Sequence, residues 1–491
     1  MFRILESIWA FKICYLKYLF TMRQKENIRE KRIEKLENLK KERANPYPAK
    51  LEPYQKIKDI ISNFKSLKGK NVGVVGRIRT IRKHGGSTFL NLEDESGKIQ
   101  AYLRRDKIGK ESYQFFLDNF DIGDFAFFKG EFFLTKKEEK TIEIEKYQIL
   151  AKSLLPLPEK WHGLQDIEER FRKRYLDLLM SPEIKEKFIL RSKIISELRK
   201  FLEKEGFIEV ETPILQEIPG GAAAQPFKTH LDALNLDLYL RIAPELYLKR
   251  LLIGGFEKIY EIGRVFRNEG IDKSHNPDYT LLEFYWAYAG YEDLMVFCEK
   301  ILGKLTEQLF GKTKIIYQGR EMGLNPPFEK LDFYEVLTEK IGADPRKLKD
   351  REIKKIAKKY NIPTEKKSQA KILDDFFKKE CKDNISKPSF ILHQPIELTP
   401  LAKNIEKDSR RAARFQLIIG GWEIANAFTE LNDPIEQKKR FEEQVKIREK
   451  GDVEAHPFDQ DFIEALEYGM PPAAGLGMGI DRLVALLTNS N

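Results

Sequence analysis

Residues 258–288 read KIYEIGRVFRNEGIDKSHNPDYTLLEFYWAY, and this stretch carries the main prediction of the fold. An apolar run leads into a polar loop that is too long for simple chain reversal, and a second apolar run follows, which predicts a hairpin. On the returning strand Tyr279, Glu283 and Tyr285 share one face, because strand side chains alternate with a period of two. An aromatic ring, a carboxylate and a phenol on one face favour a base-stacking surface beside a cation site. The alternative is a half-buried strand in which Glu283 forms a salt bridge.

A second block with unusual polar residues, GGWEIANAFTELND, spans residues 420–433. Asn426, Phe428 and Glu430 share a face of the predicted strand, whereas Glu423 has the opposite parity. We therefore expect either a bulge between Glu423 and Asn426 or a separate role for Glu423. A carboxylate such as Glu430 is costly to bury in so apolar a run unless it meets a positive partner.

A third block, GLGMGIDRL, spans residues 475–483. It is not a dinucleotide-binding fingerprint, because that motif needs a following helix, a second strand and an acidic residue about 20 positions on. It also lacks the Gly-Lys-Ser/Thr ending of a phosphate-binding P-loop. The block therefore predicts a glycine-rich strand that enters a helix, with a backbone that a ligand can approach closely and Arg482 at the helix start.

Residues 71–150 contain five strand-like runs, with one helical piece, ESYQFFLDNF, between the third and the fourth. This order is typical of an oligonucleotide-binding (OB) barrel, which stacks single-stranded bases on aromatic rings beside a basic groove. Arg77, Phe89 and Gln100 lie on the first three strands, together with Arg79, where a nucleotide could be bound. Phe89 is equally well explained as a core residue.

Composition limits the class of protein. Of the 491 residues, 33% are charged and 42% hydrophobic, which excludes a disordered chain. The sequence contains no uncharged apolar stretch of about 18 residues, so it predicts no membrane-spanning helix. The net charge of +10 weakly favours a polyanionic partner. Three widely spaced cysteines imply no disulfide framework and fit a reducing, cytoplasmic setting, and the six histidines form no zinc motif.

The N-terminus divides into two segments. Residues 1–21 are apolar but too charged to span a bilayer, and they lack a signal-peptide cleavage site. We expect translation to begin at Met22, which makes residues 1–21 a mis-annotated extension, although an interfacial amphipathic helix is the alternative. Residues 22–60 are expected to form a basic helical arm, which is either a solvated surface helix or an arm that touches RNA.

Six motifs occur in order along the chain, and they read RFRKRYLDL, PGGAAAQPFKTH, LYLRIAPELYLKRLLIGGFEKIYEIGRVFRNEG, HNPDYTLLEFYWAY, ANAFTELNDP and EYGMPPAAGLGMGIDRL. Together they closely resemble the class II aminoacyl-tRNA synthetases, and among these the bacterial-type (class IIb) lysyl-tRNA synthetases, over about residues 25–491. The resemblance implies an α+β protein: an N-terminal OB-fold β-barrel at 61–155 that reads the anticodon, then a class II synthetase domain at 156–491. That domain would be an antiparallel sheet flanked by helices, with a helical insertion at 336–388.

The resemblance also implies the site residues. Arg267 would contact the ATP α-phosphate and the lysine carboxylate, and Arg482 the γ-phosphate, so these two arginines would be catalytic. The ATP site would comprise Arg267, Glu269, His275, Tyr279, Glu423 and Arg482. The lysine site would comprise Gly221, Glu245, Arg267, Glu283, Tyr285, Asn426, Phe428 and Glu430. The anticodon would meet Arg77, Phe89 and Gln100. Partners would be tRNA(Lys), ATP, L-lysine and a second copy of the chain, with no membrane.

Two features depart from the family's pattern. The resemblance implies up to three Mg²⁺ ions per active site, held in part by two acidic residues. One of these, Glu423, is present. At the position of the other, this chain has the neutral Gln416. A neutral amide attracts Mg²⁺ less strongly, so we expect weaker occupancy of one Mg²⁺ site. The ending LLTNSN is also shorter than the family's, which puts the outer wall of the ATP pocket in doubt.

Three rival functions remain to be separated by experiment. An aspartyl-tRNA synthetase would need a cation where this chain has Glu283 and Glu430. A non-catalytic RNA-binding paralogue would keep the barrel but would have no need of intact Arg267 and Arg482. A ligase that lysylates a translation factor would lack the N-terminal barrel.

Overall fold

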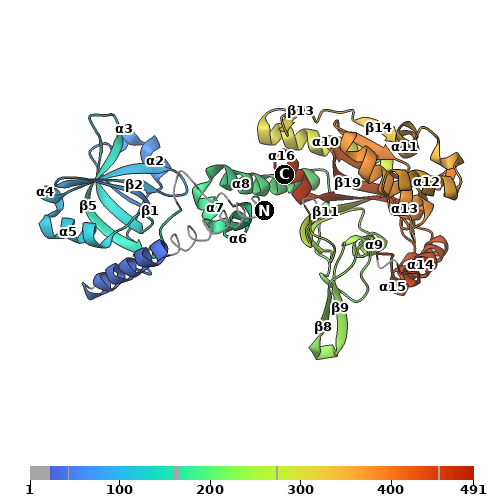
Figure 1. The fold of residues 1–491 in the computed structure, drawn as a ribbon, viewed down its shortest axis with the longest axis horizontal. Coiled ribbons are helices and arrows are strands. Elements are labelled where there is room, and N and C mark those ends of the chain that lie inside the picture. Colours follow the sequence, from blue (N-terminus) through green and yellow to red (C-terminus); the bar gives the residue numbers. More distant parts are fainter. Residues whose placement is uncertain are drawn as a thin grey trace, which may run out of the picture. The chain divides into compact units, whose positions relative to one another are not determined.

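The computed structural model describes residues 23–42, 44–158, 166–272, 275–365, 367–451 and 454–490. Residues 1–21, where we expect a mis-annotated extension, lie outside the described residues. The chain divides into two compact units, Met1–Pro182 and Glu183–Asn491, and each is described by itself (Figure 1). Within the described ranges, no helix is both long enough and apolar enough to cross a bilayer.

The first unit contains a closed five-stranded barrel in the order β1-β2-β3-β5-β4, which confirms the predicted OB-fold (Figure 1). Inward-facing side chains such as Val72, Val74 and Ile78 alternate with outward-facing ones and fill the barrel. Helix α5 lies between the third and fourth strands, as the sequence predicted. The elements are β1 (Asn71–His84), β2 (Ser87–Glu93), β3 (Lys98–Arg104), α4 (Arg105–Ile108), α5 (Lys110–Asn119), β4 (Phe125–Leu134) and β5 (Lys140–Ala151).

Residues 23–41 form a helix that packs on the barrel through one face. The guanidinium of Arg32 donates hydrogen bonds to the carbonyl oxygens of Ser153 at 2.8 Å and Ile122 at 3.0 Å. Lys35 forms a salt bridge of 2.7 Å with Asp121. The helix is therefore anchored by part of its own basic charge. Four short helices complete this unit: α2 (Ile57–Ser62), α3 (Phe64–Leu67), α6 (Ile167–Arg172) and α7 (Arg174–Met180).

The second unit is built on an eight-stranded sheet in the order β14-β15-β18-β19-β20-β11-β10-β6. Its central pairs are antiparallel, as predicted, whereas the outermost pairs β14·β15 and β10·β6 are parallel, so the sheet is mixed. The strands are β6 (Ile208–Glu209), β10 (Lys258–Phe266), β11 (Asp278–Ala287), β14 (Glu329–Asp332), β15 (Ser389–Leu392), β18 (Arg414–Ile419), β19 (Trp422–Thr429) and β20 (Ala473–Gly479).

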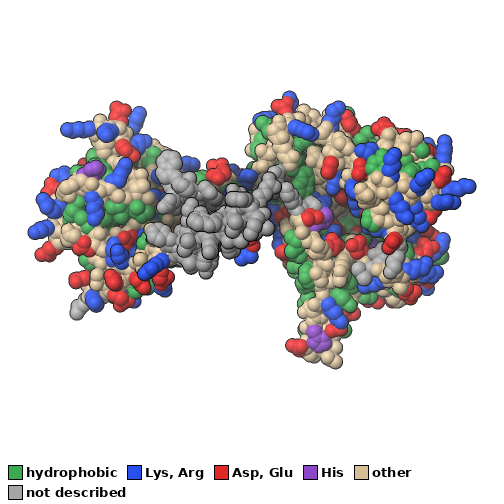
Figure 2. All heavy atoms as spheres, in the orientation of Figure 1, with side chains coloured by type: hydrophobic (Ala, Val, Ile, Leu, Met, Phe, Trp, Pro, Cys, Tyr) green, Lys and Arg blue, Asp and Glu red, His purple; other side chains and the backbone are tan. Residues whose placement is uncertain are grey.

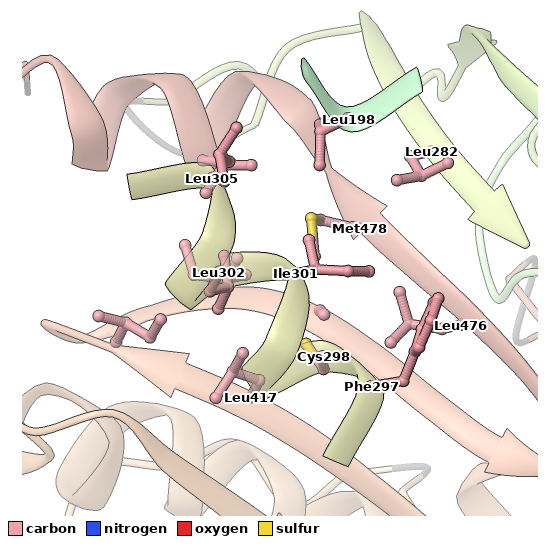
Figure 3. Close-up of a cluster of buried hydrophobic side chains, with 14 of the residues drawn as sticks. Leu198, Leu282, Phe297, Cys298, Ile301, Leu302, Leu305, Leu417, Leu476 and Met478 are labelled. Atoms are coloured by element: carbon pink, nitrogen blue, oxygen red, sulfur yellow. The ribbon is translucent and has the colours of Figure 1, made fainter. Parts of the chain in front are cut away.

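One face of this sheet is the main hydrophobic core. Leu282, Leu417, Leu476 and Met478 point from the strands towards helix α10 (Tyr291–Phe310) and are buried with its apolar side chains (Figure 3). Each fully buried side chain of this size contributes about 1.5–3 kcal/mol to stability. The alternate residues of the same strands must then point to the opposite face, which the structure uses for polar side chains.

Further helices and small sheets surround the eight-stranded sheet. The predicted insertion is helical and lies between β14 and β15, where α11, α12 and α13 share a small apolar core. The helices are α8 (Pro182–Lys204), α9 (Glu245–Ile253), α11 (Phe333–Ile341), α12 (Asp350–Lys359), α13 (Gln369–Phe376), α14 (Pro434–Glu449), α15 (Gln460–Glu467) and α16 (Ile480–Leu487). The small sheets comprise β7 (Leu215–Gln216), β8 (Lys228–Leu231) and β9 (Leu236–Leu240), then β12 (Lys314–Tyr317) with β13 (Arg320–Gly323), and β16 (Asn404–Ile405) with β17 (Asp408–Ala412).

Candidate active site

Two rows of residues cross three neighbouring strands on the polar face of the sheet. Strand β20 lies between β11 and β19, and in one row Gly477 pairs with Glu283 on one side and Asn426 on the other. In the next row Gly475 pairs with Tyr285 and Phe428. Because glycine has no side chain, β20 leaves room on this face between its two neighbouring strands. We call Gly475 and Gly477 the glycine floor.

Glu430 closes one end of the glycine floor. The side chain is fully buried, and its Oε1 atom has no hydrogen-bond partner among the described residues. A Cβ atom at Gly475 would lie 2.4 Å from this oxygen and 2.4 Å from a ring carbon of Tyr285. A buried, unsatisfied carboxylate oxygen therefore faces the floor, and a ligand with N–H donors could satisfy it.

Glu283 and Tyr285 are hydrogen-bonded neighbours on β11. The Tyr285 hydroxyl donates to Glu283 Oε2 at 3.0 Å. Burial, aided by the nearby charge of Glu245, raises the pKa of Glu283 to about 8. Burial also raises the pKa of Tyr285, so the phenol stays neutral. Among the described residues Glu283 thus has a phenol partner in place of the salt bridge of the alternative interpretation, and a cationic ligand would favour its ionised form.

Glu245 begins helix α9 and faces Gly221. Gly221 has a φ of +87°, and a Cβ atom there would lie 2.7 Å from the Glu245 Cβ, so this position requires glycine. One turn along α9, the buried Lys249 ammonium lies 2.6 Å from Glu245 Oε1 and also contacts Glu430. Glu430 therefore has the positive partner that its apolar sequence context led us to expect.

The predicted nucleotide residues gather around Tyr279 at the start of β11. The Arg267 guanidinium lies over the Tyr279 ring, 5.3 Å from its centroid. Burial raises the pKa of Tyr279, and the positive charges of Arg267 and Arg482 oppose this rise, which places both arginines near the ring. Glu269 acts on the same hydroxyl with its negative charge. An aromatic face between two cations suits a purine base and its phosphates.

His275 is placed differently from the other predicted nucleotide residues. It lies on the exposed loop between β10 and β11, and its Nδ1 atom is 2.9 Å from Asp272 Oδ2. The structure therefore brings Arg267, Glu269, Tyr279 and Arg482 together. The contact of His275 with ATP stays a prediction.

A β-bulge explains the parity of Glu423. Ile418 pairs with Glu423 and Leu417 with Ala425, so β19 has one extra residue at this point. Glu423 thereby joins Asn426 on the polar face, which was one of the two expected possibilities. Its backbone carbonyl accepts a hydrogen bond of 3.1 Å from Arg482, so the bulge also joins β19 to α16.

The predicted metal position has a sparse set of ligands. Gln416 pairs with Asn426 across the strands, and its Oε1 atom accepts a hydrogen bond of 3.3 Å from Gln394. No group of three or more His, Cys, Asp or Glu side chains able to hold a metal ion occurs in the part of the chain that the structure describes. One carboxylate and one amide oxygen fit Mg²⁺ only as a supplement to ATP phosphates and water.

Arg414 is a functional candidate that the sequence did not single out. It is buried, and its Nε donates to Asn426 Oδ1 at 2.8 Å while an Nη atom donates to Thr399 at 2.6 Å. Because arginine only donates, the acceptor must be the amide oxygen of Asn426. The Asn426 amide nitrogen is then oriented to donate elsewhere. A buried arginine inside an apolar strand, as in ARFQLII, is the signal that could have identified it.

The barrel carries a separate polar surface on β1–β3. Phe89 is half-buried on the outer side and stacks on Tyr102, with ring centroids 4.5 Å apart. Arg77 lies over the Phe125 ring at 4.3 Å. Gln100 is buried and accepts a hydrogen bond of 2.9 Å from Thr141, which makes it less accessible than predicted. Tyr102, which the sequence analysis did not select, therefore belongs to the aromatic surface.

Comparison with known proteins agrees with this geometry. Residues 166–491 match the family described as tRNA synthetases class II (D, K and N), and residues 72–150 match the OB-fold nucleic acid binding domain. A lysine–tRNA ligase of Carboxydothermus hydrogenoformans is 48% identical over 460 residues, covering 93% of this chain and 94% of the relative. The chain belongs to the class II lysyl-tRNA synthetases. The lysine–tRNA ligase of Pelotomaculum thermopropionicum is 49% identical, covering 94% of this chain and 91% of the relative. That of Aquifex aeolicus is 51% identical, with 86% and 71% covered.

We expect the two glycines of the floor to differ in their tolerance of a methyl group. Gly475→Ala should lower the free energy of unfolding by about 1–3 kcal/mol, because overpacking against Glu430 and Tyr285 is unavoidable. Gly477→Ala is the matched control, since its Cβ atom would lie 3.8 Å from Glu283, an ordinary contact. Urea unfolding of the two variants of this lysyl-tRNA synthetase measures the difference. Equal unfolding midpoints would contradict the close packing of Glu430 and Tyr285 over Gly475.

Proposed function

We propose that this chain is a lysine–tRNA ligase. It activates L-lysine with ATP to form lysyl-adenylate and pyrophosphate, and then transfers lysine to the 3′ end of tRNA(Lys). The observation that carries this proposal is a cluster of three buried carboxylates: Glu283 and Glu430 border the glycine floor, and Glu245 lies within electrostatic range of both. An ammonium group has three donors and no acceptor, so a buried one requires such oxygens. The names of the curated relatives support the same activity.

Two ammonium groups of the substrate would use different carboxylates. The ε-ammonium would be held by Glu283, Tyr285 and Glu430, beside the Phe428 ring, and the α-ammonium by Glu245 and the backbone of Gly221. Arg267 and the amide nitrogen of Asn426 would bind the α-carboxylate. This assignment uses the unsatisfied Glu430 oxygen and the orientation that Arg414 imposes on Asn426.

The first step is an in-line attack of the lysine carboxylate on the α-phosphorus of ATP, and pyrophosphate leaves. The transferred lysyl group then passes to a hydroxyl of the terminal ribose of tRNA. The protein forms no covalent bond, so catalysis rests on positioning and on charge. Arg267 would stabilise the α-phosphate and Arg482 the γ-phosphate, while Tyr279 and Glu269 hold the adenine. His275 would reach the nucleotide from the loop.

Glu423 and Gln416 are the residues that would hold Mg²⁺ against ATP. When bound, Mg²⁺ would neutralise negative charge on the phosphates. Burial lowers the pKa of Arg414, and the charges of Glu423 and Asp374 oppose this, so positive charge already lies near Glu423. Both this charge and the neutral Gln416 support weak protein binding of the metal ion.

The barrel and the sheet edge support two partners. The aromatic and basic surface of β1–β3 would bind the anticodon of tRNA(Lys) through Arg77, Phe89 and Gln100. Near the short edge strand β6, Ile208 and Leu215 are about half exposed, which supports a homodimer covering this edge. Lys and Arg side chains lie among acidic ones over both units on the face in Figure 2.

Buried Cys298 and Cys381 are free thiols, which supports a cytoplasmic setting.

Two exchange assays test the function directly. Purified protein should catalyse ATP–pyrophosphate exchange that depends on lysine, and it should then charge tRNA(Lys). Exchange without tRNA charging would indicate a protein-modifying ligase, and tRNA binding without exchange would indicate a non-catalytic paralogue. Exchange driven by another amino acid, such as aspartate, would refute the proposal.

The ionisation of Glu283 predicts a pH dependence of lysine binding. Its raised pKa means that Glu283 is protonated below pH of about 8, and lysine needs the carboxylate, so affinity should rise as pH increases to that value. Between about pH 6 and 8 each unit should tighten binding by up to about tenfold. Calorimetry in two buffers should show proton release on binding at neutral pH. Glu283→Gln is the control and should release fewer protons on binding, and a release equal to that of the original chain would contradict the assignment.

The amide at position 416 predicts a raised requirement for Mg²⁺. Gln416→Glu adds the missing negative charge, so its half-saturating Mg²⁺ concentration should fall by a factor of about 3 to 10. A titration of exchange activity with Mg²⁺ at saturating ATP measures this. Gln394→Glu, one hydrogen bond further away, is the matched control. Superimposable titrations of Gln416→Glu and the original chain would refute the prediction.

The half-buried ring of Phe89, on the outer side of the barrel, predicts a role in tRNA binding alone. Phe89→Ala should weaken tRNA(Lys) binding by about tenfold, since one base–aromatic stack contributes about 1–3 kcal/mol. Exchange without tRNA should stay unchanged, because the barrel lies in the other unit. Phe125→Ala is a comparison variant that removes the ring beneath Arg77. An unaltered tRNA affinity in Phe89→Ala would exclude the stacking role.

A further inference from the structure

Lys249 is a buried cation that the proposed reaction does not use. It lies on α9, one turn after Glu245, and its side chain is fully enclosed. Its ammonium lies 2.6 Å from Glu245 Oε1 and contacts Glu430 Oε2. The rings of Phe428 and Phe462 lie 5.4 Å and 6.0 Å from the same nitrogen. The protein therefore bridges two carboxylates with an ammonium of its own.

The bridged carboxylates are the two expected to bind opposite ends of the substrate. Glu245 begins α9, whereas Glu430 follows β19, much later in the sequence. No single helix or strand therefore holds the two residues together. Each uses one oxygen on Lys249, which leaves Oε2 of Glu245 and Oε1 of Glu430. The latter has no hydrogen-bond partner in the described part of the chain and faces Gly475.

We propose that Lys249 is a positioning and specificity-determining residue of the lysine site. It fixes the separation of Glu245 and Glu430, and its positive charge favours the ionised form of both, so that each presents its second oxygen to one ammonium of the substrate. The site would thereby select an amino acid whose two ammonium groups have the matching spacing. This inference deepens the proposed function and rests on it.

The charges around Lys249 support this role. Glu245 faces it from α9 and Glu430 from the end of β19, while Glu283 lies on β11 within electrostatic range. Burial alone would lower the pKa of Lys249, but the two bridged carboxylates outweigh burial and raise it, so the ammonium stays charged.

His456 is a further titratable group near this ammonium. Burial, together with the charge of Lys249, lowers its pKa to about 4, so it is neutral at physiological pH and adds no charge. Lys249 and Arg267 are the positive charges that oppose the rise in the pKa of Glu283 that burial causes. Without Lys249, mutual repulsion would raise the carboxyl pKa values, and the binding-competent ionised form would require a higher pH.

Three substitutions of the full-length chain test the proposal: Lys249→Met, Lys249→Gln and Lys249→Arg. Lysine-dependent ATP–pyrophosphate exchange is measured from about pH 6 to 9. Met and Gln, which remove the charge, should raise KM for lysine about tenfold or more near neutral pH. They should also shift the acidic limb of kcat/KM by about half a unit or more towards alkaline pH. KM for ATP should change by less than about threefold. Arg keeps the charge and should leave the limb in place, even if packing weakens affinity.

The comparison between variants separates electrostatics from packing. Ornithine serves as the second substrate, and the preference for lysine over ornithine should fall about fivefold or more in the Met and Gln variants. An unmoved acidic limb in both, or an equal shift in Lys249→Arg, would overturn the proposal. If Lys249→Met fails to fold, the Gln and Arg pair decides alone. Absence of lysine-dependent exchange in the unsubstituted chain would instead refute the proposed function.

Discussion

The burial of three carboxylates on one side of a sheet is the constraint on which the rest of the site depends. Negative charges cannot be removed from water next to one another unless cations or hydrogen-bond donors compensate them. The chain meets part of this need itself, with Lys249 between Glu245 and Glu430 and with the Tyr285 hydroxyl on Glu283. Glu430 Oε1 still lacks a hydrogen-bond donor among the described residues, and a cationic ligand could supply one. In the proposed function, this electrostatic arrangement would select the substrate.

The sheet can carry this site because its two faces have different tasks. Leu282, Leu476 and Met478 pack under α10 and hold the strands rigid, while their alternate neighbours carry the polar groups. The central strand contributes glycines on the polar side, where Glu430 and Tyr285 fill the space above Gly475 and no side chain crowds Gly477. A bulge in β19 then turns Glu423 to the same face as Asn426. Rigid strands position reacting groups better than loops do.

Local motifs predicted most of the fold. The five strand-like runs and the helix after the third are confirmed as a closed barrel, and the hairpin at residues 258–288 is confirmed as β10 and β11. The antiparallel centre of the large sheet is confirmed. Its parallel edge pairs were not foreseen, because β6, β14 and β15 are only two to four residues long and carry too short a pattern to predict a strand. The proposed domain boundaries, such as 155/156, stay predictions.

What the sequence determined by itself is the set of side chains that share a face, since the period of two in a strand depends only on the backbone. It placed Glu283 beside Tyr285 and Asn426 beside Phe428, and it required a positive partner for Glu430. Only the tertiary structure decided that this partner is Lys249, that Arg414 orients Asn426, and that Tyr102 stacks on Phe89 while Gln100 is buried. The physical reason is that each of these contacts joins separate elements, and their meeting depends on sheet order and helix packing, which no local periodicity encodes.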